Sequence, residues 1–172
     1  GLGSASFVFS EGESKISVGA IAAVNSMGSL TMPGSKTMWA FPYEQNDELG
    51  KQPMPEKNTK IDLDFSFELP LGKNTTLVTV ATDAVLTKPQ ARRVAIMAQD
   101  GLARAIRPIH SPFDGDCVFV LSTGKCELSD PVVGVSKLGM LAADCVARAI
   151  SRGVYLAETM GDLESYRDRY GS

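Results

Sequence analysis

The sequence predicts an α/β fold in which helices cover β-sheet. Two strands, the second rich in glycine and alanine, stand near the start of the chain, and an apolar strand with a helix after it lies in the middle. A short apolar strand and a second amphipathic helix follow. Because strands and helices alternate in this order, helices packed on sheets are favoured, in two layers or in four. The 172 residues suit a single domain with a sizeable core.

The first part of the chain predicts a hairpin and a long loop. Apolar residues at 7–9 and 16–24 indicate two paired strands, and the small residues of the second indicate that a large element packs close to it. Proline, glycine and mixed charges between residues 32 and 60 are typical of a surface loop, which we expect to be flexible at about 42–60. Residues 61–68 alternate apolar and polar side chains, as in a half-buried strand or a mobile flap.

A strand and a helix are predicted next. Residues 76–82 have the composition of a buried strand. Thr87 with Gln90 three residues later matches a capping box, and Pro89 falls in the first turn, so we expect a helix to begin at Thr87. Its apolar positions recur every three or four residues and are mostly alanine, which suits close packing on a sheet. Pro108 is expected to end this helix.

The last third of the chain predicts one more strand and one more long helix. Residues 117–121 form a short apolar strand, and residues 123–125 are expected to turn the chain. A helix is predicted over about 135–152, with an apolar stripe along one side and Gly153 as its stop. The tail from residue 158 onward has room for one short helix.

The composition excludes several classes of function. Hydrophobic residues make up 44% and charged residues 22%, with a net charge of −3, so nothing favours nucleic acid as a partner. No apolar run approaches the roughly 18 residues that span a bilayer, and the start lacks the features of a signal peptide, so we expect a cytoplasmic protein without a membrane partner. The three cysteines lack CxxC spacing, and we expect reduced thiols and no metal site.

Asn74 and Thr75 lie directly before the predicted strand at 76–82 and suggest a nucleophile. If the bond between them were cut, Thr75 would carry a hydroxyl nucleophile and a free α-amine on one residue. An α-amine has an ordinary pKa of about 7.7–8.0, close to the pH at which a general base works best. Asparagine and threonine before a strand are also a common turn, and Thr76 offers a second frame for the cleavage.

Three further polar positions are candidates for the same chemistry. Asp114 and Asp116 flank a glycine in a turn before the strand at 117–121, where they could orient a nucleophile or only form an Asx-turn or a solvated loop. Asn25 ends the strand at 16–24, and its amide could donate to an oxyanion or simply close a turn.

A serine hydrolase triad is not favoured. His110 is the only histidine, and it would have to lie beside a serine such as Ser111 or Ser122. No GxSxG motif is present to hold such a serine in a strained turn. We therefore expect a surface role for His110.

Several segments together resemble one family of self-cleaving hydrolases. They are NTTLVTVATDAVLT at 74–87, AIMAQDGLARAIRP at 95–108, HSPFDGD at 110–116, GLGSAS at 1–6 and VGAIAAVN at 18–25. The chain is similar over most of its length to the DmpA-type hydrolases, which include the L-aminopeptidase/D-amidases and the nylon-oligomer endo-hydrolases. Threonine preceded by asparagine resembles the nylon-oligomer branch, because the aminopeptidase branch typically has glycine before serine.

The resemblance implies an αββα sandwich of the N-terminal-nucleophile type, of which this chain is the C-terminal part. It also implies self-cleavage between Asn74 and Thr75, so that 1–74 ends a larger subunit and 75–172 is the smaller one. Thr75 is then the nucleophile and Asn25 the oxyanion donor, while Asp114 and Asp116 orient the nucleophile. The implied substrates are linear amide oligomers of the nylon type or peptides, and no cofactor is needed.

The resemblance further implies a homo-oligomer, in particular a tetramer. Members of the family are longer than this chain, and a lysine of their site lies just upstream of the segment that matches GLGSAS, outside these 172 residues. Two alternatives follow from the sequence. One is an uncleaved, non-catalytic fragment or structural subunit, and the other is an aminopeptidase that acts on unusual N-terminal residues.

Overall fold

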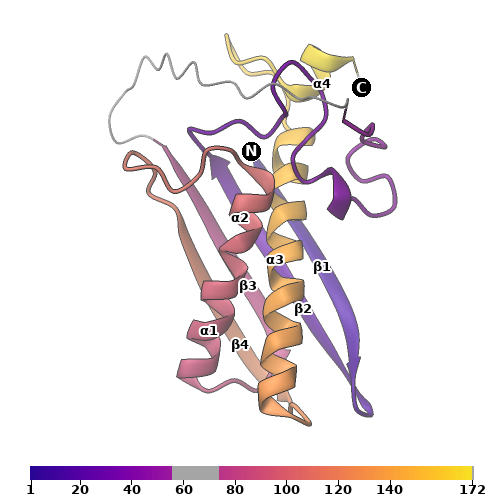
Figure 1. Ribbon diagram of the computed structural model, residues 1–172, viewed down its shortest axis with the longest axis vertical. Coiled ribbons are helices and arrows are strands. Elements are labelled where there is room, and N and C mark those ends of the chain that lie inside the picture. The colour runs from indigo at the N-terminus through magenta and orange to yellow at the C-terminus, as the bar shows by residue number, and fades with distance from the viewer. Residues whose placement is uncertain (56–73, 172) are drawn as a thin grey trace.

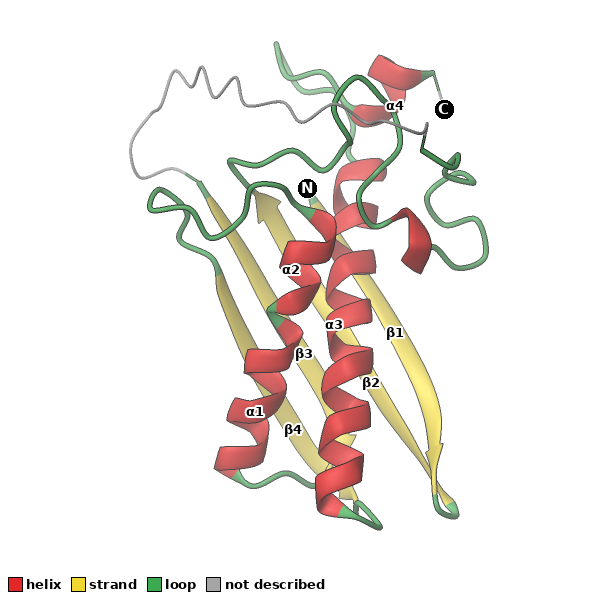
Figure 2. Cartoon of the chain, viewed as in Figure 1, coloured by secondary structure: helices red, strands yellow, loops and turns green. Residues whose placement is uncertain are grey.

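The computed structural model describes residues 1–55 and 74–171. In this part of the chain four strands form one sheet in the order β1-β2-β3-β4, and helices cover one of its faces (Figures 1 and 2). β1 (Leu2–Glu11), β2 (Ser14–Asn25) and β3 (Thr75–Ala84) are antiparallel neighbours, whereas β4 (Cys117–Cys126) runs parallel to β3. The predicted α/β class is confirmed, and the strand expected at 61–68 lies outside the described residues.

β1 and β2 form the expected hairpin, with strands longer than their apolar segments. Gly12 lies in its turn at φ 62°, a conformation that glycine adopts without strain. Side chains of β2 alternate, so that Ala20 and Ala22 are buried beneath the helices while the residues between them face outward. These small side chains leave room for the long helix α3 (Pro131–Tyr155), which packs across β1 and β2 and is the large element expected here.

The parallel pairing of β3 and β4 requires a crossover, which α1 (Lys88–Ala98) and α2 (Asp100–Ala105) provide. The predicted capping box is present at the start of α1. The Thr87 N–H donates to the Gln90 side chain at 2.8 Å, and the Thr87 hydroxyl accepts from the Gln90 N–H at 3.4 Å. These two bonds give partners to the N–H groups of Thr87 and Gln90, which the start of a helix would otherwise leave without a hydrogen bond.

The single helix expected between Thr87 and Pro108 is instead broken at Gln99. Gly101 follows the break and lies directly against α3, because a Cβ at this position would fall 2.3 Å from the Ala143 carbonyl oxygen. The chain therefore brings its backbone, and not a side chain, against α3 at this point.

α3 (Pro131–Tyr155) begins and ends beyond its predicted limits. Asp130 caps it by accepting from the N–H groups of the second and third helical residues, a start signal that the apolar stripe alone did not reveal. Gly153 does not stop the helix, which continues to Tyr155. This glycine is instead explained by the close approach of β1, since a Cβ on Gly3 would fall 2.3 Å from the Gly153 nitrogen. Among the described helices none has both the length and the apolar character needed to cross a membrane.

The predicted turn at 123–125 is also absent, since β4 continues to Cys126. Gly124 adopts φ 65°, and the pairing with β3 shifts register between Thr82 and Ala84. The glycine therefore accommodates an irregularity within the strand and not a reversal of the chain. All three cysteines are free, as expected, and burial raises the pKa of Cys145 to about 12.

Carboxylates hold the loop that follows β2, which includes the short helix η1 (Phe41–Tyr43). Glu44 accepts three backbone N–H groups of the next turn at 2.7–2.9 Å. Glu48 forms a largely buried ion pair with Arg148 of α3, at 2.5 Å. These contacts tie residues 44–52 to the helical layer. The flexibility expected at about 42–60 stays a prediction.

The second face of the sheet is open in the described part of the chain. Large apolar side chains on this face are 47–66% exposed, namely Leu2, Val8, Ile21, Leu77, Phe119 and Leu121. Exposed apolar areas of this kind mark surfaces that another element covers. The chain therefore supplies one helical layer and one sheet.

Candidate active site

Three segments that carry predicted site residues meet at one end of the sheet (Figure 1). β2 is antiparallel to β3, so the end of β2 lies beside the start of β3. β4 is parallel to β3, so the loop before β4 arrives at the same end. Asn25, Thr75 and the pair Asp114 and Asp116 are thereby brought together, although more than 80 residues separate the first from the last.

Thr75 is the first residue of β3, and its hydroxyl forms a hydrogen bond with the carbonyl group of the preceding residue, Asn74. Thr75 Oγ1 donates to the Asn74 carbonyl oxygen at 2.6 Å. Its cross-strand partner is Asn25, and both side chains lie on the open face of the sheet. Directly opposed residues of antiparallel strands have Cβ atoms about 4.5–5.5 Å apart, so the side chains of Asn25 and Thr75 begin beside each other.

Thr76 points the other way. Its side chain is fully buried under the helical layer, and its hydroxyl has no hydrogen-bond partner among the described residues. Alternation along β3 therefore places only one of the two neighbouring threonines at the site. The geometry favours Thr75 over Thr76 as the candidate nucleophile.

Asp116 connects the start of β3 with the loop before β4. Its carboxylate is 3% exposed and accepts from the Thr76 N–H at 2.9 Å through Oδ1. The other oxygen, Oδ2, lies 3.1 Å from Nδ1 of His110. Asp116 thus holds the backbone immediately after Thr75.

Asp114 connects the turn after β2 with the same loop. Its carboxylate accepts from the Ser111 hydroxyl at 2.7 Å and from the N–H groups of Ser111 and Met27 at 3.3 Å. The bond to Ser111 gives Asp114 the local turn role considered from sequence, and the bond to Met27 adds a long-range one. Residue 115 therefore lies between two aspartates, of which Asp114 is bonded to the turn after β2 and Asp116 to the start of β3.

Sequence reasoning missed the contribution of Gly115. The Gly115 N–H donates to the Asn74 carbonyl oxygen at 3.0 Å, within a parallel bridge between residues 74 and 114. A Cβ at Gly115 would fall 2.7 Å from Thr75 Oγ1. Its place between two acidic candidates was the only signal in the sequence that could have pointed to it.

His110 lies at the surface, as expected, and it also contacts Asp116. It is held at φ 58°, which is uncommon for a residue with a side chain, and its ring reaches Asp116 while remaining 42% exposed. Among the described residues neither candidate serine pairs with it, because Ser111 donates to Asp114 and Ser122 to the Ala84 carbonyl. The arrangement is therefore not a Ser/His/Asp triad.

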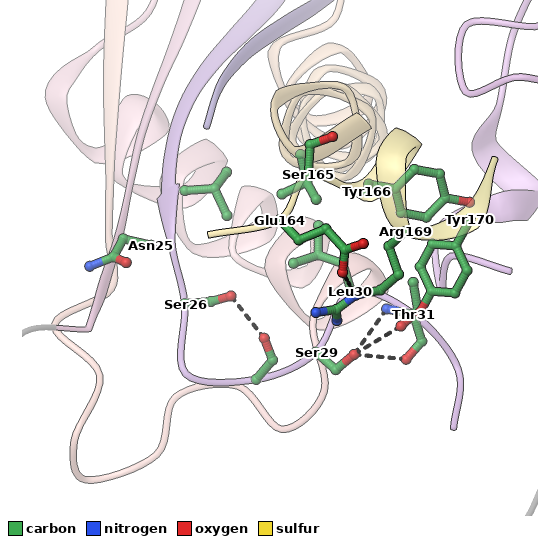
Figure 3. A pocket seen from close by; sticks show the side chains of 13 residues that line it. Asn25, Ser26, Ser29, Leu30, Thr31, Glu164, Ser165, Tyr166, Arg169 and Tyr170 are labelled. Carbon is green, nitrogen blue, oxygen red and sulfur yellow. Dashed lines mark hydrogen bonds and ion pairs between the residues drawn. The ribbon is translucent and has the colours of Figure 1, made fainter. Parts of the chain in front are cut away.

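A pocket of about 320 Å³ borders the site between the turn after β2 and α4 (Tyr166–Tyr170). Glu164 and Arg169 line it as an ion pair of 3.0 Å, and burial raises the pKa of Tyr166. Figure 3 shows the Asn25 side chain directed away from these residues, on the other side of the β2 backbone. The described residues contain no group of three or more His, Cys, Asp or Glu side chains that could hold a metal ion.

Comparison with solved structures defines the class of fold. The structure resembles that of a protein from Pyrococcus horikoshii OT3, with a TM-score of 0.63 and 26% identity over 96% of this chain and 42% of that one. It also resembles the L-aminopeptidase D-Ala-esterase/amidase of Ochrobactrum anthropi, a variant of the Ntn-hydrolase fold, with a TM-score of 0.61 and 22% identity over 94% and 42% of the two chains. The fold is thus of the Ntn-hydrolase type, as the resemblance implied.

Sequence comparison defines the family. Residues 1–167 match the model of peptidase family S58. Uncharacterized aminopeptidases of Mycobacterium tuberculosis H37Rv and Mycobacterium leprae are both 36% identical, over 99% and 96% of this chain and 52% and 47% of their own lengths. The chain belongs to peptidase family S58, and it spans about half the length of the curated relatives it matches.

Proposed function

We propose that the protein is an amide hydrolase that matures by cutting its own chain between Asn74 and Thr75. The observation that carries this proposal is the position of the Thr75 hydroxyl, 2.6 Å from the carbonyl oxygen of the bond to be cut. A nucleophile held this close to an acyl group reacts far faster than one that must diffuse to it. The family supports a hydrolytic function, and the geometry supports this particular residue.

The proposed cleavage proceeds in two balanced steps. The Thr75 Oγ1 attacks the Asn74 carbonyl carbon, the C–N bond breaks, and the hydroxyl proton ends on the departing nitrogen. This gives an ester between Asn74 and the Thr75 side chain, together with a free α-amine on Thr75. Water then hydrolyses the ester, leaving a carboxylate on Asn74 and restoring the hydroxyl.

After cleavage, Thr75 carries both the nucleophile and the base. Its amine takes the hydroxyl proton as Oγ1 attacks a substrate amide and returns it to the leaving amine. Asn25 lies across the ladder and donates to the oxyanion. Asp116 fixes the backbone that follows Thr75, and Asp114 fixes the loop that carries Asp116.

The proposed substrates are short linear amides, either oligomers of the nylon type or peptides. Asparagine before the nucleophile favours the oligomers, whereas the aminopeptidase names of the mycobacterial relatives favour peptides with a free amino terminus. A panel of both kinds, assayed with the matured protein, separates the two. Turnover of amide oligomers with no release of N-terminal residues from peptides supports the first, and the reverse pattern supports the aminopeptidase.

Intact mass and N-terminal sequencing test the maturation step. The uncut protein is expected to yield a piece that begins at Thr75 and a piece that ends at Asn74. Thr75→Ala is expected to stay uncut, and Thr75→Ser is expected to restore cleavage because it keeps the hydroxyl. Thr76→Val is the matched control, since it removes the neighbouring hydroxyl on the opposite face and is expected to leave cleavage intact. A wild-type chain that stays whole at neutral pH would favour the uncleaved, non-catalytic subunit.

A further inference from the structure

The oxygen of the bond proposed to be cut has two hydrogen-bond donors. The Asn74 carbonyl oxygen accepts from Thr75 Oγ1 at 2.6 Å and from the Gly115 N–H at 3.0 Å. Only one of these can persist through the reaction. When Thr75 Oγ1 turns from the oxygen to the carbon that it attacks, it stops being a donor, and the Gly115 N–H remains.

We infer that the Gly115 N–H is a catalytic donor for self-cleavage, where it stabilises the negative charge that forms on the Asn74 oxygen. This inference rests on the proposed function, whose chemistry it deepens. As the new C–O bond forms, the π-electron pair of the Asn74 carbonyl moves onto its oxygen, and it returns when the C–N bond breaks. A donor already aimed at that oxygen stabilises the tetrahedral species more than the resting amide.

The surroundings of Gly115 keep this donor in place. The carboxylate of Asp114 is held by Ser111 and Met27, and the carboxylate of Asp116 is held against the Thr76 N–H. Both neighbours of residue 115 are therefore fastened to different segments. A donor fixed in this way needs no reorganisation when the charge develops, which is the source of its effect.

The absence of a side chain at this position serves the same step. A Cβ at residue 115 would fall 2.7 Å from Thr75 Oγ1, inside the space that the hydroxyl occupies. Glycine thus allows one residue to place its N–H on the oxygen of the scissile bond while leaving the nucleophile unobstructed. Asn25 is proposed above to act on the substrate oxyanion, whereas Gly115 acts on the oxyanion of the chain itself.

Replacing the amide by an ester tests the donor without adding any atom near Thr75. Glycolic acid is introduced at position 115 of the uncut protein by stop-codon suppression in cell-free translation, which exchanges the N–H for an oxygen. The control places the same hydroxy acid at Gly12, an exposed turn residue far from the site. Cleavage is followed by electrophoresis and intact mass on the folded fraction from size exclusion, with a thermal melt of each variant.

The ester at 115 is expected to slow cleavage by about 10²–10³-fold, the effect typical of removing one oxyanion donor, while the ester at 12 matches the wild type. A wild type that cuts normally, together with a 115 ester that cuts within about threefold of it, would overturn the inference and leave the proposed function standing. A wild type that never cuts would overturn the proposed function itself.

A second measurement does not depend on how the ester variant folds. In uncut, isotope-labelled Thr75→Val, NMR can detect the scalar coupling across a hydrogen bond between the Gly115 nitrogen and the Asn74 carbonyl carbon. We expect this coupling to be present. Its absence in a well-folded sample would show that the donor is not aimed at the scissile oxygen, and the inference would then fail.

Discussion

Gly115→Ala should separate self-cleavage from folding, because it adds one methyl group beside the nucleophile and keeps the backbone N–H. The added Cβ falls 2.7 Å from Thr75 Oγ1, whereas ordinary contacts begin at 3.4 Å. The Cβ of residue 115 and Thr75 Oγ1 must therefore move apart by about 0.7 Å. The backbone at residue 115 cannot easily make this movement, because hydrogen bonds hold Asp114 and Asp116 on either side of it. The easier response is rotation of the Thr75 side chain, which takes its hydroxyl away from the Asn74 carbonyl.

The expected effect on rate is large and the expected effect on stability is small. A misplacement approaching 1 Å lowers the rate of a positioned reaction by about 10²-fold, so cleavage should slow by that order. Gly115 is not among the residues with positive φ, so alanine fits its backbone. The restriction that alanine puts on the unfolded chain contributes about 0.4–1 kcal/mol, which offsets part of the contact, and the free energy of unfolding should change by less than about 1 kcal/mol.

The assay is a time course of freshly synthesised polypeptide on denaturing gels, with chemical unfolding of the uncut Thr75→Ala background to measure stability. Gly19→Ala is the matched control, since Gly19 lies in the middle of β2 and its Cβ would lie 3.3 Å from the Ala5 carbonyl oxygen, a tight contact that asks for a shift of only about 0.1 Å. This control should cut like the wild type. If Gly115→Ala also cut at the wild-type rate, the position assigned to the Thr75 hydroxyl would be wrong.

Three further predictions concern the residues around the site and the core. Thr76→Val should raise the free energy of unfolding by about 1 kcal/mol in denaturant titrations, because it removes a buried hydroxyl that has no partner among the described residues. His110→Gly should slow cleavage by about tenfold, since glycine permits the positive φ but removes the contact with Asp116. His110→Asn should restore the rate, because asparagine tolerates that φ and its amide can donate to Asp116. Equal cleavage rates for the two variants would refute a positioning role for His110. The hydrogen bond from Lys137 holds the pKa of Glu11 below its ordinary value of 4.5, so the stability it contributes is present above that pH and is lost as pH falls through the lowered pKa. Thermal melts should therefore show Glu11→Gln less stable than the wild type at neutral pH, with the difference closing as the pH falls below 4.5 and through the lowered pKa of Glu11, and a constant difference at every pH would contradict this.

Local chemistry made the start of α1 and the hairpin of β1 and β2 predictable. Thr87 and Gln90 form the capping box that their spacing indicates, and alternation in the strands marks the face that the helices cover. Errors occurred where a glycine has a tertiary reason to be present. Gly153 lies within a helix because β1 passes against it, and Gly124 lies within a strand because it absorbs a register shift. A glycine in a sequence reveals freedom of the backbone but not which neighbour uses that freedom.

Most side chains of the candidate site stand out in the sequence, whereas its backbone donor and the contact of His110 do not. The acidic pair and Asn25 stand out as polar residues at strand ends, and the parallel pairing of β3 with β4 brings the pair to the start of β3. Gly115 acts through its N–H, which every residue other than proline possesses, so no residue type signals it. His110 was missed because its contact depends on a positive φ that the sequence does not display.

The sheet is shared by the two pieces that a cut after residue 74 would create. β2 belongs to the first piece and β3 to the second, yet they pair along their length, and α3 of the second piece packs over both strands of the first. The nicked protein would therefore stay together as a tight pair of chains under native conditions. Once denatured, however, it could reassemble only by a second-order encounter, so recovery would depend on concentration and would be far slower than the original, single-chain folding. Maturation in such an architecture is a one-way event that the molecule cannot easily repeat.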